Sequence, residues 1–152
     1  MALVKGENSY VDVSEADAYF STRLGSAAWV DSDEAAKEAA LVTATRVLDD
    51  MEWMGLPYSP VQVLAFPRRI QDIAEPTPVR FVRAVFEMAL HLLQNPELMM
   101  DTGGVESLSV GPISLTNISN PRLIPQYVER LIAPYTLSSG LLSTPTPWWR
   151  AW

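Results

Sequence analysis

The sequence predicts an all-α domain, a small bundle of about four helices with one β-hairpin insertion at residues 106–116 and an extended C-terminal tail. Two observations lead to this prediction. Apolar residues recur at three- and four-residue spacing in four separate segments, which is typical of helices with one buried face. Strict alternation of apolar and polar residues occurs on both sides of a Gly-Pro dipeptide, which indicates a hairpin.

The composition is typical of a single globular domain. The chain has 152 residues, of which 48% are hydrophobic and 19% charged, so it can bury a substantial core. We expect a helical domain over residues 1–135, with the hairpin inside it, and a partner-docking tail over residues 136–152. The absence of cysteine excludes disulfides and thiolate metal sites. No apolar run reaches about 18 residues, so we expect no membrane segment.

The first two helices are predicted from their capping residues. Ser14 is the expected N-cap of the first helix, and Gly25 stands where a helix commonly ends. The second helix is expected to begin at Asp31, because Glu34 follows three residues later as in a capping box. It is expected to end near Met51.

Residues 53–78 contain five prolines, which exclude a single regular element. We expect a structured connection there, with one short turn over residues 61–64. The third helix is expected to begin at Pro78, which suits a first helical position, and to continue over residues 79–94. Its polar stripe consists of Arg80, Arg83, Glu87, His91 and Gln94.

The hairpin and a fourth helix complete the expected elements. A two-residue turn at Gly111-Pro112 brings the alternating residues on either side into register. The fourth helix should begin at Pro125 and end near Ala133, before Pro134. The expected facing pairs of the hairpin are Val110 with Ile113 and Leu108 with Leu115.

The tail is rich in tryptophan. Tryptophan and arginine are the side chains most often found at binding hot spots, and prolines stiffen an extended segment. We expect the tail to insert into a partner or a neighbouring subunit. The alternative is that it folds back and its tryptophans cover the chain's own core. The expected partner-binding residues are Pro145, Pro147, Trp148, Trp149, Arg150 and Trp152.

The sequence offers no convincing catalytic or metal constellation. His91 is the only histidine, so any nucleophile–histidine or metal–histidine scheme would depend on it alone. The position of His91 on the polar stripe of the third predicted helix favours a surface or interface histidine. Asp49, Asp50 and Glu52 could be imagined as metal ligands, but adjacent helical residues do not face one another, so a solvated helix end is expected. We expect no enzyme, no cofactor and no metal.

The net charge of −7 is unevenly distributed. Residues 1–60 hold eleven acidic and four basic residues, whereas residues 61–152 hold seven of each. Only two lysines occur in the chain. This balance argues against sequence-independent nucleic-acid binding, which depends on neutralising phosphates.

Several charged residues remain candidates for subunit contacts. Arg68 and Arg69 follow Phe66-Pro67. They either contact an anion or a partner, or they point to solvent or pair with the acidic second helix. The third helix could pair across subunits in a heterologous, ring-closing contact. The candidate subunit-contact residues are Arg68, Arg69, Arg80, Arg83 and Glu87.

Four segments carry a resemblance to a known family. They are NSYVDVSEADAYFSTRLGSAAW (8–29), KEAALVTATRVLDDMEWMG (37–55), QVLAFPR (62–68) and PVRFVRAVFEMALHLL (78–93). Together they resemble the small head-tail connector, or adaptor, proteins of tailed bacteriophages. These proteins often carry a label that likens them to the primosomal DnaT single-stranded-DNA-binding protein.

The resemblance implies a non-enzymatic role in an assembly. Such adaptors form a ring, commonly of twelve subunits, under the portal protein in the neck of the virion, after assembly in the host cytoplasm. The ring extends the DNA channel without sequence-specific binding and docks tail or neck proteins. The label implies the alternative, a single-stranded-DNA-binding replication protein, in which aromatic residues should be interleaved with basic ones.

Overall fold

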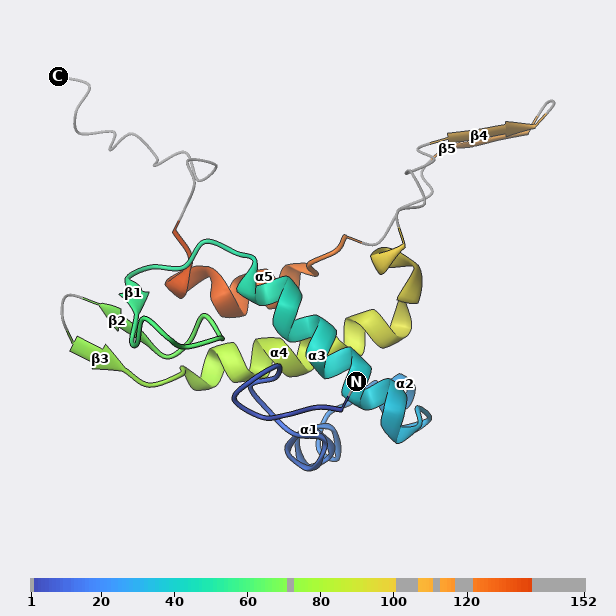
Figure 1. Ribbon diagram of the computed structural model, residues 1–152. Helices are drawn as coiled ribbons and strands as arrows, with labels where there is room; N and C mark the ends of the chain where they lie inside the picture. The colour runs from blue at the N-terminus through green and yellow to red at the C-terminus, as the bar shows by residue number, and fades with distance from the viewer. Residues whose placement is uncertain (1, 71–72, 101–106, 111–112, 117–121, 138–152) are drawn as a thin grey trace, which may run out of the picture.

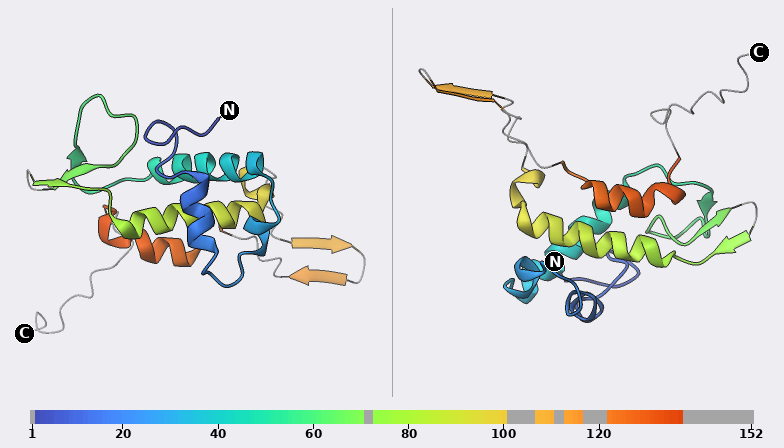
Figure 2. Two further views of the ribbon diagram at one scale, coloured as in Figure 1. Left: turned by 90° about the horizontal axis from the view of Figure 1, so that it is seen from below. Right: turned by 180° about the vertical axis from the view of Figure 1, so that it is seen from behind.

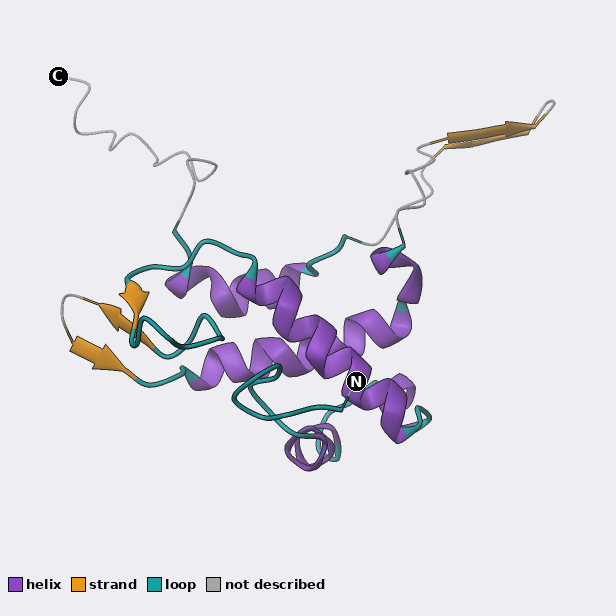
Figure 3. Cartoon of the chain, in the orientation of Figure 1, coloured by secondary structure: helices purple, strands orange, loops and turns teal. Residues whose placement is uncertain are grey.

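The computed structural model describes residues 2–70, 73–100, 107–110, 113–116 and 122–137. The fold is mainly helical, with two small antiparallel sheets (Figure 3). This confirms the expected helical bundle with a hairpin. The helices are α1 (Val13–Phe20), α2 (Ala27–Val30), α3 (Glu34–Asp49), α4 (Val79–Gln94) and α5 (Gln126–Ile132), with 3-10 helices η1 (Pro96–Met99) and η2 (Ala133–Tyr135).

Helix α4 forms the centre of the fold. It lies between α3 and α5 (Figure 2). In the left view of Figure 2, α1 runs across these helices instead of along them. Side chains around much of the circumference of α4 are therefore buried, including Phe81, Val85 and Met88, each at 0% exposure. The single apolar stripe expected from the sequence is too narrow for this helix, because α4 has neighbours on more than one side.

Aromatic side chains fill the core in two groups. One consists of Tyr10, Trp53, Phe66 and Phe81, where the Phe66 and Phe81 ring centroids lie 4.3 Å apart. The other consists of Tyr19, Phe20, Trp29 and Phe86, and it contacts the middle of α4 through Phe86. Edge-to-face and stacked ring pairs of this kind stabilise a core beyond the area they bury. The Phe66-Pro67 peptide bond is cis.

The helix starts differ from the predicted ones. Asp12, not Ser14, caps α1: its carboxylate accepts from the Glu15 N–H at 2.9 Å, and the Glu15 carboxylate accepts from the Asp12 N–H at 2.9 Å. The Ser14 hydroxyl instead donates to Asp12. Helix α1 also ends at Phe20, well before the predicted stop at Gly25. A reciprocal capping box therefore prevails over a nearby serine.

The second predicted helix begins later than expected. Asp33 caps α3, accepting from the Ala36 N–H at 2.7 Å, so the predicted start at Asp31 is wrong. Asp31 instead ends α2, a single turn that the sequence did not predict. This turn places Trp29 in the core, where it is 1% exposed.

The proline-rich connection contains a three-stranded antiparallel sheet. Its strands are β1 (Leu56–Pro57), β2 (Arg68–Ile70) and β3 (Ile73–Glu75), in the order β1-β2-β3. Gly55 makes the close approach to β2 possible: its φ is +77°, and an added Cβ would lie 2.2 Å from the Arg69 carbonyl oxygen. This sheet was not predicted, because strands of two or three residues are too short to show alternation of apolar and polar residues.

The predicted hairpin is confirmed. Strand β4 (Ser107–Val110) pairs antiparallel with β5 (Ile113–Thr116), with Leu108 opposite Leu115 and Val110 opposite Ile113. Its turn residues lie outside the described part of the chain. Figure 1 shows the hairpin away from the helices.

The fourth predicted helix corresponds to α5, which is followed by η2. The chain then pairs with the segment after α3: Trp53 forms a bridge with Thr136, and the Leu137 N–H donates to the Glu52 carbonyl at 3.0 Å. The tail residues predicted to bind a partner, from Pro145 to Trp152, lie outside the described residues. No helix within the described ranges is long and apolar enough to cross a membrane.

Candidate nucleic-acid interface

Helices α4 and α5 lie side by side and run antiparallel, so they form one continuous face. At one end, Arg80 Nη2 donates to the Arg130 carbonyl oxygen at 3.0 Å. At the other end, His91 Nε2 lies 2.8 Å from the Arg122 carbonyl oxygen, and a carbonyl only accepts, so Nε2 carries the proton. The eleven residue steps from Arg80 to His91 extend about 16 Å along α4. We call this surface the α4–α5 face.

Arginines with exposed side chains follow this face. They are Arg80, Arg83, Arg122 and Arg130. The ion pairs of the described residues join Lys5 to Glu15, Arg23 to Glu87 and Lys37 to Asp17. None of the four exposed arginines takes part in one, so within the described chain their charges are not neutralised by a carboxylate.

An exposed aromatic ring lies among these arginines. Tyr127 projects from α5 and is 52% exposed. It lies at a cavity of about 190 Å³ that is also lined by Arg23, Glu87, His91 and Gln94. Arg130 follows Tyr127 by three residues and therefore lies on the same side of α5. The face thus combines an aromatic ring that is free to stack on a base with exposed arginines before and after it in the chain, Arg122 and Arg130.

A buried ion pair supports the middle of the face. The Glu87 side chain is 5% exposed, and Arg23 Nε and Nη2 each donate to it at 2.7 Å. The Tyr19 hydroxyl also donates to Glu87 Oε1 at 2.7 Å. Glu87 raises the pKa of Arg23, and burial, with the hydrogen bond to Glu87, raises the pKa of Tyr19. Because its charge is neutralised internally, Glu87 does not oppose an anion on the face.

The acidic residues lie mainly on other elements. Helices α1 and α3 carry Glu15, Asp17, Glu34, Glu38 and Asp49. The exposed acid within α4 and α5 is Glu129. A net charge of −7 for the whole chain therefore coexists with a basic local surface, and binding of an anion depends on the local field.

The end of α3 differs from the solvated cluster expected there. Asp50 and Glu52 are exposed, but Asp49 is half-buried and accepts a hydrogen bond from the Tyr10 hydroxyl. The Phe66 N–H in turn donates to the Tyr10 oxygen at 3.0 Å. Burial raises the pKa of Asp49. Among the described residues, no group of three histidine or acidic side chains is arranged to hold a metal ion.

The candidate subunit-contact residues do not form one surface. Arg80 and Arg83 lie on the α4–α5 face, and Arg69 is exposed on β2. Glu87 is buried at 6% exposure, not on an exposed polar stripe. Arg68 is half-buried, and its guanidinium donates to backbone carbonyls of its own chain. Burial also lowers the pKa of Arg68.

Four residues of the face, Arg23, Arg122, Tyr127 and Arg130, were not predicted from the sequence. Tyr127 and Arg130 could have been found from their three-residue spacing on the predicted fourth helix. Arg23 offered no such signal, because its partner Glu87 lies 64 residues away.

Comparison with known proteins places the chain in a family. The family model described as "Putative DnaT-like ssDNA binding protein" matches residues 2–144. The chain belongs to this family. The match includes the hairpin and reaches beyond the segments that resembled phage adaptors. No curated protein and no solved structure matches the chain. The description of this DnaT-like family agrees with the single-stranded-DNA-binding alternative, and no match names a head-tail connector.

Proposed function

We propose that this DnaT-like protein binds single-stranded DNA on the α4–α5 face. The observation that supports this is the set of four exposed arginines near the half-exposed ring of Tyr127, none of which forms an ion pair with another described residue. Arginines neutralise backbone phosphates, and an aromatic ring stacks on a base of any identity. The family description points to the same ligand.

The proposal gives a modest affinity with a measurable dependence on salt. Each phosphate neutralised on a single strand contributes about −0.7 to the slope of log K against log salt concentration. Four arginines therefore give a slope of about −3 if all of them contact phosphates. The acidic remainder of the chain repels DNA and restricts contact to this face.

Fluorescence anisotropy with a labelled oligothymidylate, over a series of salt concentrations, tests the charge contribution. Arg83→Ala should weaken binding and reduce the slope by about 0.7. Arg69→Ala is the matched control, because it removes the same charge from an exposed position on β2. Equal changes in affinity and salt slope for the two variants would show that DNA does not bind on the α4–α5 face. A lack of binding at low salt would refute the proposal.

A second pair of variants tests stacking. Tyr127 and Tyr58 are both 52% exposed, but Tyr58 follows β1, outside the α4–α5 face. Tyr127→Ala should cost about 1–3 kcal/mol of binding free energy, as measured for base–aromatic stacking. Tyr58→Ala should bind like the wild type. Equal affinities of the two variants would show that Tyr127 does not contact the bases.

A head-tail connector is the second candidate function, and the hairpin favours it. A two-stranded hairpin is marginally stable alone in water, and β4 and β5 pack mainly on each other among the described elements. A neighbouring subunit could supply the missing contact. In this role the protein forms a ring, of twelve subunits by resemblance, between portal and tail or neck proteins of a virion. DNA passes through the ring without sequence-specific binding, and no catalytic step is required.

Mass measurement of the protein alone and mixed with portal protein tests this candidate. A chain shortened to residues 1–137 keeps the contact of Leu137 with Glu52, so it should remain helical. We expect it to lose its association with portal, if the tail docks there as predicted. Tyr127→Ala, which removes none of the candidate subunit-contact residues, should leave that association unchanged while it weakens DNA binding, and this separates the two candidate functions. Full portal binding by the shortened chain would contradict the predicted role of the tail.

A further inference from the structure

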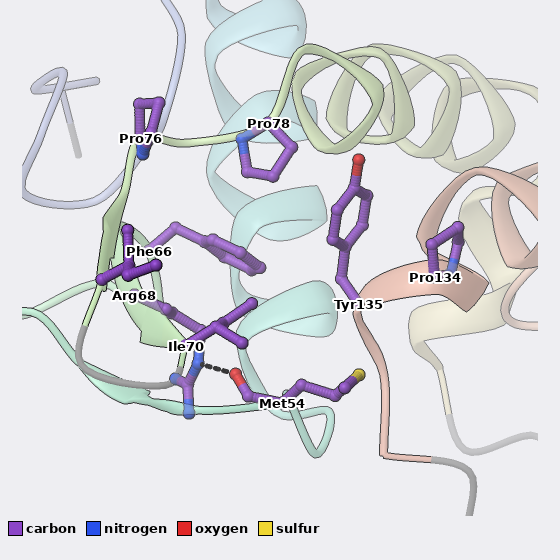
Figure 4. Close-up of a pocket in the computed structure, with 9 residues that line it drawn as sticks. Met54, Phe66, Arg68, Ile70, Pro76, Pro78, Pro134 and Tyr135 are labelled. Carbon is purple, nitrogen blue, oxygen red and sulfur yellow. Dashed lines mark hydrogen bonds between the residues drawn. The ribbon is translucent and has the colours of Figure 1, made fainter.

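A pocket of about 300 Å³ lies between the three-stranded sheet, the start of α4 and the end of the α5 segment (Figure 4). Its walls are mainly apolar. Figure 4 shows the Phe66 and Tyr135 rings on either side of the pocket, with Pro78 and Met54 between them at opposite edges. Ile73 is 62% exposed and Met54 is 38% exposed, so apolar surface at the mouth is left in contact with water.

The one charged group in the wall, Arg68, has most of its hydrogen-bond donors occupied by backbone carbonyls of its own chain. Arg68 Nε donates to the Met54 carbonyl at 2.8 Å, and Nη2 donates to the Gly55 carbonyl at 2.7 Å. Nη1 donates to the Ala65 carbonyl at 3.1 Å. The guanidinium therefore offers a ligand mainly its planar face, and arginine stacks readily on aromatic rings. The pocket therefore suits a flat apolar group better than an anion.

The chain leaves the described structure beside this pocket. Tyr135 lines it, and the Tyr135 carbonyl accepts from the Met54 N–H at 2.8 Å. Ten residues, SSGLLSTPTP, separate Leu137 from Trp148. Eleven residue steps reach at most about 36 Å, and a flexible chain of that length has a mean end-to-end distance of about 18 Å. Trp148 and Trp149 are therefore within reach of the pocket of their own chain.

We propose that the pocket holds an indole of the chain's own C-terminal segment, from Trp148 or Trp149. A linker of about ten residues that is long enough to span the distance gives its end an effective concentration in the millimolar range. In a micromolar solution, the segment of the same chain therefore outcompetes that of a second copy. Burial of the ring covers the apolar mouth of the pocket, and stacking on Arg68 adds a cation–π contribution. The inference does not depend on DNA binding.

Acrylamide quenching of tryptophan fluorescence in the full chain tests the proposal. Two of the five tryptophans, Trp29 and Trp53, are 1% and 4% exposed and form a constant background. Ile73→Glu places a charge at the mouth of the pocket and should raise the accessible fraction of the emission. Val30→Glu is the matched control, since Val30 is 65% exposed on α2, and it should leave quenching unchanged. Trp148→Phe and Trp149→Phe, made singly, identify the protected ring.

The results separate the alternatives. Protection that persists on dilution of a monomer and is lost with Ile73→Glu supports the proposal. Protection that disappears on dilution would overturn it in favour of a second copy as the donor. Quenching that Ile73→Glu leaves unchanged would overturn the site itself. If circular dichroism shows that Ile73→Glu is unfolded, Met54→Glu tests the same wall of the pocket.

Discussion

The buried ion pair between Arg23 and Glu87 leads to an asymmetric prediction for stability. Arg23→Met leaves the Glu87 carboxylate, 5% exposed, with the Tyr19 hydroxyl as its remaining donor. Removing one partner of a buried pair costs about 3–5 kcal/mol. We expect the lower end, about 3 kcal/mol, because the Arg23 side chain is 31% exposed and water can reach the site.

The reverse substitution should cost less. Glu87→Met removes three hydrogen bonds to the carboxylate, two from Arg23 and one from Tyr19. Both partners are half-buried and can bond to water instead, so we expect a smaller net loss, about 1.5–2 kcal/mol. Urea unfolding followed by far-ultraviolet circular dichroism measures both variants. For a chain of this length, a loss of about 3 kcal/mol lowers the melting temperature by about 6–12 °C.

Two results would refute this reasoning. The first is a larger loss for Glu87→Met than for Arg23→Met, since the cost is attributed to a stranded carboxylate. The second is a deficit of Arg23→Met that stays constant in acid. Protonation of the stranded carboxyl removes its charge, and with it the cost of burial, so the deficit should shrink as the pH falls.

Three further predictions concern local structure. Gly55→Ala should lower the free energy of unfolding in urea by more than about 2 kcal/mol, because the added Cβ would lie 2.2 Å from the Arg69 carbonyl oxygen. Gly6→Ala is the control, since Gly6 has φ +86° but open space around it. This substitution should cost only the backbone strain of about 1 kcal/mol. Burial raises the pKa of Asp49, so its ionised form opposes folding, and the free energy of unfolding falls as pH rises past the usual aspartate range. Asp49→Asn should remove this fall, which a series of unfolding curves at different pH values measures. The same fall in Asp49→Asn as in the wild type would contradict the prediction. Asp12→Ala should cost about 1 kcal/mol and speed amide exchange in the first turn of α1, whereas unchanged exchange would show that the capping box is dispensable.

The sequence was most informative where one pattern extended over many residues. Helix α4 carries a sixteen-residue amphipathic pattern after Pro78, so its limits were predicted to within one residue. The register of the hairpin followed from a turn and alternation that agree with each other. A slip of one residue would exchange the two faces of each strand. The alternation therefore excluded the neighbouring registers, and the predicted pairs were correct.

The remaining features depend on contacts that are distant in sequence or on competition between neighbouring residues. Asp12 and Ser14 are both good capping residues, and the return bond from Glu15 decides between them. The pairing of Arg23 with Glu87 requires α1 and α4 to be placed in space first. The polar stripe of α4 in the sequence therefore did not reveal that its central acid, Glu87, is buried.

The base of the C-terminal segment is fastened to the middle of the chain. Glu52 and Met54 exchange backbone hydrogen bonds with Leu137 and Tyr135, directly after α3 ends. A pulling force on the C-terminus would thus be transmitted to α3 through these bonds before it could unwind α5. A partner bound to the last residues would therefore be mechanically coupled to the core and not to a peripheral helix that unfolds first.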